Sequence, residues 1–169
     1  MVPLVAHTRA ATAALALDRK AWASHPRFRT QALLLGSHEN FRQTSAILIS
    51  RAESGSDTTA LRWVFQAWKG AMHSHERYEE LKLYPYLHRR WGLSFDVARE
   101  GHRALSQAEE VVLARAGEDG PASAGLTDAL RRHDEILREH LALEEELVLP
   151  ALLALTPDEF DHYSRSRRP

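Results

Sequence analysis

The chain has 169 residues, enough for one domain with a buried core, and its 44% hydrophobic and 27% charged residues are typical of a globular protein. The absence of cysteine excludes disulfides, thiolate zinc sites and cysteine-ligated iron–sulfur clusters. The net charge of -1 and the short apolar runs favour neither nucleic acid nor a membrane as a partner, so we expect neither. The lack of cysteine and of a secretory signal pattern predicts a cytoplasmic location.

Glycine and proline are sparse and divide the chain into long helical segments. Residues 1–27 contain an alanine-rich helical pattern and form an N-terminal arm, which the sequence does not place against the other helices. The first long helix is predicted over residues 28–52. The second is predicted over residues 57–91, where Gly92 ends it, and Pro85 should kink or interrupt it because proline lacks a backbone N–H.

The second half of the chain predicts two more long helices. Ser94 is expected to cap the third helix, which should end at Gly117. The segment 118–125 is rich in glycine and small residues and contains a Gly-Pro pair, so it should form a loop. The fourth helix is predicted to begin near Leu126 and to bend at Pro150.

No segment of useful length alternates polar and apolar residues as a β-strand does. Long helices with short connections predict an all-α fold, here an antiparallel up-down four-helix bundle over residues 28–155. Residues 156–169 should form a short C-terminal helix and a tail, because a proline just after Thr156 is typical of a helix start.

Each of the four long helices carries an apolar stripe at steps of three and four residues, the face expected to pack in the core. A histidine interrupts each stripe near its middle, and two stripes also carry a glutamate one turn later. These six residues are His38, His75, Glu79, His102, His140 and Glu144. Buried carboxylates without a partner are strongly unfavourable, so several that converge in one core need a common cation. The pattern therefore predicts a metal centre.

The two halves of the predicted bundle repeat one another. His38 and His75 are separated by almost the same number of residues as His102 and His140, and the segments 75–85 and 140–150 share a histidine, two glutamates and a proline at identical offsets. A histidine and a glutamate four residues apart face the same side of a helix. The symmetry suits two equivalent metal ions with bridging carboxylates, and imidazole with carboxylate favours iron, zinc or manganese.

At these residues the sequence resembles the hemerythrin family, specifically the bacterial hemerythrin-like or HHE cation-binding domains, over roughly residues 33–153. The matching pieces stand in order in the chain: His38-Glu39-Asn40-Phe41-Arg42, His75-x3-Glu79-Glu80 ending in Leu83-Tyr84-Pro85, Glu100-Gly101-His102, and His140-x3-Glu144-Glu145-Glu146 ending in Leu149-Pro150. The resemblance implies a non-haem centre of two iron ions (Fe2+/Fe3+) with an oxo or hydroxo bridge. It also implies that Glu79 and Glu144 bridge the ions, and that the ligand is a small diatomic molecule or a peroxide.

The sequence departs from the oxygen-carrying hemerythrins at one position. Those proteins have a second histidine one turn after the one on the third helix, where this chain has Ser106, and this disfavours reversible oxygen carriage. Glu76 and Glu109 are candidates for an additional carboxylate ligand. His133 lies two turns before His140 and is expected to support the ligands rather than to bind metal. Glu145 is expected to face solvent.

The predicted centre leaves several functions open. The favoured one is binding or reduction of dioxygen, hydrogen peroxide or nitric oxide, with catalase-like or peroxidase-like turnover as one form of it. The alternative is a non-catalytic iron or oxygen sensor or carrier that acts through a protein partner, which the sequence does not identify. A metal-free helical interaction module is disfavoured because it leaves buried carboxylates unpaired.

Overall fold

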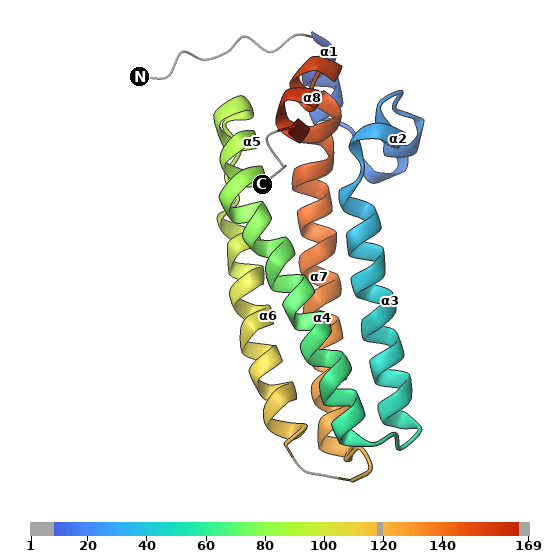
Figure 1. Ribbon diagram of the computed structural model, residues 1–169. Helices are drawn as coiled ribbons and strands as arrows, with labels where there is room; N and C mark the ends of the chain where they lie inside the picture. Colours follow the sequence, from blue (N-terminus) through green and yellow to red (C-terminus); the bar gives the residue numbers. More distant parts are fainter. Residues whose placement is uncertain (1–8, 118–119, 166–169) are drawn as a thin grey trace.

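The computed structural model describes residues 9–117 and 120–165, and within them the fold is all-α, as predicted. Four long helices lie side by side and form the body of the molecule (Figure 1): α3 (Leu34–Glu53), α4 (Thr58–Tyr78), α6 (Asp96–Arg115) and α7 (Ala124–Ala154). The two pairs α3–α4 and α6–α7 are each connected at the same end of the body. None of the described helices is long and apolar enough to cross a membrane.

The described part of the N-terminal arm, residues 9–27, packs on the C-terminal part of α7. It contains α1 (Arg9–Leu15) and the 3-10 helix η1 (Arg19–Ser24), and it is followed by α2 (Phe28–Gln31). Ala11 and Ala14 of α1 are buried in the same apolar cluster as Leu155, and Trp22 of η1 is buried against Leu149. The short helix α8 (Pro157–Arg165) lies at the same end of the molecule (Figure 1). The expected C-terminal helix is therefore present, and the arm covers a surface of α7.

Two of the predicted helices are interrupted. The helix expected over 28–52 is divided into α2 and α3, and the helix expected over 57–91 contains a π-helical segment, η2 (Glu79–Leu83), between α4 and α5 (Tyr84–Trp91). The Tyr84 N–H bonds to the carbonyl of Glu79, five residues earlier, directly before Pro85. The wider turn accommodates the proline, which cannot donate a backbone hydrogen bond. Gly92 ends α5 in the left-handed conformation at φ 74°.

The long helices in the second half begin and end close to the predicted positions. Ser123 caps α7 by accepting a hydrogen bond from the Leu126 N–H, so this helix starts before Leu126. Ser94 Oγ accepts from the Asp96 N–H at 3.3 Å, although Phe95 occupies the cap position itself. Helix α6 ends at Arg115, two residues before the expected end, and residues 118–119 of the predicted loop lie outside the described residues. Helix α7 continues through Pro150.

The core contains two large apolar clusters with a polar layer between them, and a small third cluster of Trp22, Leu149 and Leu153. Along α3, Leu34 belongs to one cluster and Phe41 to the other, and His38 lies between. The same order holds along α7, where Leu137 and Val148 belong to different clusters and enclose the His140–Glu144 pair. The polar residues that interrupt the stripes therefore share one level of the body, which is sealed by apolar side chains on both sides.

Candidate metal centre

The six histidines and glutamates predicted as ligands come from α3, α4, η2, α6 and α7 and converge in this polar layer. His38, Glu79 and Glu144 are 0% exposed, and His102 and His140 are 5% exposed. His75 alone among the six is only half-buried. Helical spacing explains the convergence, because a histidine and a glutamate four residues apart lie on the same face and this face is the apolar one.

Four of these residues form the first group of potential ligands. His38, His75, Glu79 and Glu144 each offer one ligand atom, and these atoms lie within 4.8 Å of one another. The two Nε2 atoms of His38 and His75 are 3.1 Å apart, and His75 Nε2 lies 2.8 Å from Glu79 Oε1. Glu144 Oε2 lies 3.4 Å from His38 Nε2. Two imidazoles and two carboxylates thus point into one small volume.

His102, His140 and Glu144 form a second group within the same distance limit. Glu144 therefore belongs to both groups, and its Oε2 is 3.7 Å from His140 Nε2. Glu79 also faces both, because its Oε1 is the atom next to His75 and its Oε2 lies 3.5 Å from His102 Nε2. The two carboxylates stand between the two pairs of histidines, which is the arrangement that bridging ligands require.

The donor atoms fit a cation because several of them have no hydrogen-bond partner. In the six residues of the centre, six buried atoms make no hydrogen bond: Glu79 Oε1 and Oε2, Glu144 Oε2, His102 Nε2, and His140 Nδ1 and Nε2. Buried polar atoms in proteins are normally hydrogen-bonded, so a cluster of exceptions indicates a ligand. The set contains only nitrogen and oxygen donors, which suits iron, zinc or manganese.

Several buried groups of the cluster have shifted pKa values. Burial lowers the pKa of His140 to about 3, so its ring stays neutral, the form that binds metals. Burial and the charge of Glu79 raise the pKa of Glu144 well above its usual value. Burial would also raise the pKa of Glu79, but the rings of His102, His38 and His75 outweigh it and hold this pKa low. A cation between the two carboxylates would favour the ionised form of both.

One histidine in each half of the repeat also contacts a glutamate that is not among the six predicted ligands. Glu145 Oε1 lies 3.1 Å from His38 Nδ1, and Glu80 Oε1 lies 2.8 Å from His102 Nδ1. Each of these glutamates follows a central glutamate directly, so the two contacts are related by the repeat. A hydrogen bond from Nδ1–H to a carboxylate turns Nε2 towards a metal and raises its basicity.

The expectation that Glu145 faces solvent is wrong, because its side chain is 1% exposed. Arg42 and Arg19 each contact its carboxylate at 2.8 Å in addition to His38. Burial alone would raise the pKa of Glu145, but the hydrogen bonds from His38, Arg42 and Arg19 lower it to about 2. The reason for the burial is tertiary, because the arm brings Arg19 across this part of α7.

The three further candidates lie outside both groups of potential ligands. Glu109 accepts a hydrogen bond from His73 at 2.8 Å, and Lys69 lies 3.4 Å from the same oxygen. His133 packs edge-on against Trp68, with ring centroids 4.9 Å apart, and burial lowers its pKa to about 4. Glu76 is buried, and this raises its pKa to about 7.

Two residues at the centre were not predicted from the sequence. Tyr84 is fully buried, stacks on Phe95 and donates a hydrogen bond from its hydroxyl to Glu144 Oε1. The repeat did not indicate Tyr84, because Leu149 stands at the matching position before Pro150.

The second of these residues is Gly101, which lies so close to His140 that a Cβ atom there would be 2.2 Å from Nδ1. In the sequence, the only indication of this close approach is that a glycine stands directly before His102.

Residues 29–152 match the family model described as the Hemerythrin HHE cation binding domain, which covers more than half of the chain. The chain belongs to this family. The resemblance seen in the sequence is thereby confirmed, and all six predicted ligands of this HHE domain lie inside the matched segment. The arm, including Arg19, and helix α8 lie outside it. No curated protein and no solved structure matches the chain.

Proposed function

We propose that this HHE domain is an antiparallel four-helix bundle that holds two iron ions and binds or reduces a small oxidant, namely dioxygen, hydrogen peroxide or nitric oxide. The observation that carries the proposal is the shared position of Glu79 and Glu144 between the two pairs of histidines. Two bridged ions account for five of the six hydrogen-bond-free donor atoms, because His140 can bind through only one of its two ring nitrogens, whereas one ion near either pair would leave more of them unpaired. We assign the ligands to His38, His75, Glu79, His102, His140 and Glu144.

The iron pair, when bound, supplies two electrons and an open coordination position. The residues of the chain position the donors and limit access of water. The Tyr84 hydroxyl donates a hydrogen bond to Glu144 Oε1 and so fixes the orientation of this carboxylate. Burial and the charges of Glu144 and Glu79 raise the pKa of Tyr84 far above its usual value, so the hydroxyl stays protonated and continues to donate. The apolar clusters on both sides exclude water from the layer.

A second candidate function is a sensor or carrier that acts through a protein partner. It is favoured by the contact chain from Arg19 to Glu145 to His38, which connects the N-terminal arm to a proposed ligand. A change at His38 on metal or oxidant binding would alter this contact and release or tighten the arm. We expect a cytoplasmic protein with neither nucleic acid nor a membrane as its partner.

Metal analysis of the purified protein tests the proposal directly, with about two irons expected per chain. Glu79→Gln and Glu144→Gln keep the size of the side chain but remove the charge, so the second iron should be lost or held weakly. Glu146→Gln is the matched control, because Glu146 is 67% exposed. Glu80 and Glu145 are unsuitable controls because they contact His102 and His38.

The proposal fails if the protein is fully loaded by one zinc ion and takes up no iron. A spectrum before and after exposure to peroxide separates the two candidate functions. Turnover of peroxide supports an oxidant reductase, whereas reversible dioxygen binding without turnover supports the sensor or carrier.

A further inference from the structure

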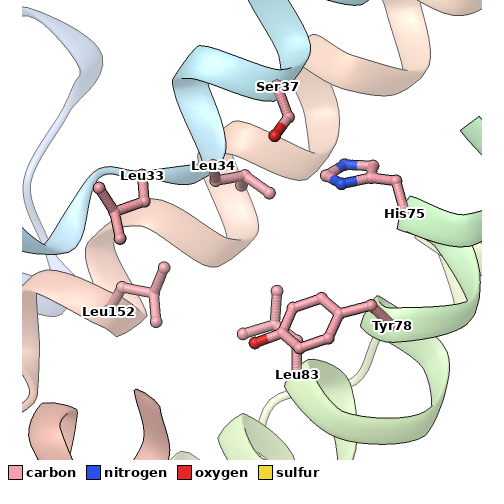
Figure 2. Close-up of a pocket in the computed structure, with 7 residues that line it drawn as sticks. All are labelled: Leu33, Leu34, Ser37, His75, Tyr78, Leu83 and Leu152. Atoms are coloured by element: carbon pink, nitrogen blue, oxygen red, sulfur yellow. The ribbon is translucent and has the colours of Figure 1, made fainter. Parts of the chain in front are cut away.

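A pocket of about 370 Å³ opens beside the proposed metal centre (Figure 2). Its volume falls in the range of roughly 300–1,000 Å³ that is typical of small-molecule sites. It lies between the start of α3, the α4–η2 junction and the C-terminal part of α7. The lining residues are Leu33, Leu34, Ser37, His75, Tyr78, Leu83 and Leu152.

The pocket has an apolar floor and a polar side. Leu34, Leu83 and Leu152 are buried and form the floor, whereas Leu33 and Ser37 are exposed and form the rim. Figure 2 shows the ring of His75 and the phenol of Tyr78 directed towards the same space as these leucines. An apolar cavity with a few polar groups is suited to a compact organic molecule with one polar end.

His75 connects this pocket to the centre. Its side chain is 12% exposed, and its Nε2 lies 2.8 Å from Glu79 Oε1. The corresponding histidine of the other half, His140, has a side chain that is only 1% exposed. The two halves of the repeat are thus unequal in access, although their ligand patterns match.

Two features distinguish the His75 side, where this pocket opens, from the His140 side. Gly101 directly precedes His102 and lets His140 approach α6 closely, whereas the matching position before His38 is occupied by Ser37, a lining residue of the pocket. The π-helical segment η2 also widens the chain at residues 79–83, while the matching residues 144–148 continue the α-helix of α7. π-Helical segments frequently mark functional sites.

We propose that this pocket binds the apolar body of a short organic hydroperoxide, or of the alcohol that its reduction produces, with the polar end beside His75. This inference rests on the proposed function, because it names the class of oxidant. Reduction of such a hydroperoxide breaks the O–O bond and consumes two electrons, which two bound Fe2+ ions would supply. Two protons from solvent complete the products, which are one alcohol and one water.

The binding test uses 2-phenylpropan-2-ol, the redox-inert alcohol that corresponds to cumene hydroperoxide. Calorimetric titration of the iron-loaded protein should show saturable binding of one molecule. Leu33→Trp should fill the pocket from its rim and weaken binding about tenfold or more. Leu33 is 54% exposed, so this change should be tolerated by the fold, which circular dichroism checks. Leu81→Trp is the matched control, because Leu81 is 62% exposed and does not line the pocket, and it should leave binding unchanged.

Single-turnover oxidation of the reduced protein gives an independent measurement. The rate with cumene hydroperoxide, relative to the rate with hydrogen peroxide, should fall about tenfold or more in Leu33→Trp and stay unchanged in Leu81→Trp. Absence of saturable alcohol binding, or equal effects of the two tryptophan variants, overturns the pocket inference while two-iron loading and peroxide reactivity keep the proposed function. Alcohol binding to a protein that takes up no iron overturns the proposed function and, with it, the assignment of a hydroperoxide as the ligand, while the pocket still binds the alcohol.

Discussion

Replacement of Gly101 by alanine tests whether close packing on α6 positions His140. A Cβ atom at residue 101 would lie 2.2 Å from His140 Nδ1, 2.9 Å from Cγ and 3.1 Å from Cε1. Contacts of this length cannot persist, so the imidazole must move away from α6. Because His140 Nε2 is a proposed metal donor, the movement should also displace this atom from Glu144 Oε2, 3.7 Å away in the native protein.

Two opposing effects determine how much Gly101→Ala changes the stability of the protein. Alanine in place of a helical glycine stabilises by about 0.5–1 kcal/mol where there is space for the methyl group. Gly70 of α4 has nothing within 4 Å of such a methyl group, so Gly70→Ala should show this gain. Overpacking at residue 101 should oppose it by about 1–3 kcal/mol. Gly101→Ala should therefore melt about 2–12 °C below Gly70→Ala, at about 2–4 °C per kcal/mol for a chain of this size.

The assay compares thermal unfolding and iron content of the two alanine variants. The melting temperature of the iron-free protein measures the effect of the changed packing alone. In the iron-loaded protein His140 is also lost as a ligand, which should weaken metal binding about 10–100-fold. Equal melting temperatures and equal iron content in the two variants would refute the reasoning, because a displaced His140 should affect both.

Three other measurements test the centre and the residues around it. Removal of iron should lower the melting temperature, because the facing carboxylates lose their cation, and an unchanged value would show that metal binds elsewhere. Glu145→Gln should weaken iron binding about 10–100-fold by releasing His38, whereas Glu146→Gln should have no effect. His133 has a pKa of about 4 in the folded protein against 6.5 unfolded, so its contribution to the stability of the iron-free protein is complete above pH 6.5 and is lost as the pH falls to 4. His133→Phe should remove this pH dependence, up to about 3 kcal/mol, and chemical unfolding at pH 7 and pH 4 measures it.

The sequence alone determined the helical class and the set of residues that meet in the core. Both follow from the helical period, which is a local property: a histidine on an apolar stripe must face the core, and a glutamate four residues later must face the same side. The matching pieces of the two hairpins then identified the family, because His38, His75, His102 and His140 stand in order with their glutamates.

Only the tertiary structure decided what surrounds this centre. Burial of Glu145 depends on Arg19, a residue 126 positions away that arrives with the arm, and no periodic pattern connects the two. The difference between the His75 and His140 sides depends on how closely neighbouring helices approach one another. Gly101 and the π-helical turn at 79–83 determine this approach, and neither has a counterpart in the other half of the repeat. Contacts between distant segments are fixed by the packing of the whole chain, so a symmetric sequence pattern folds into a centre in which His75 is more exposed than His140.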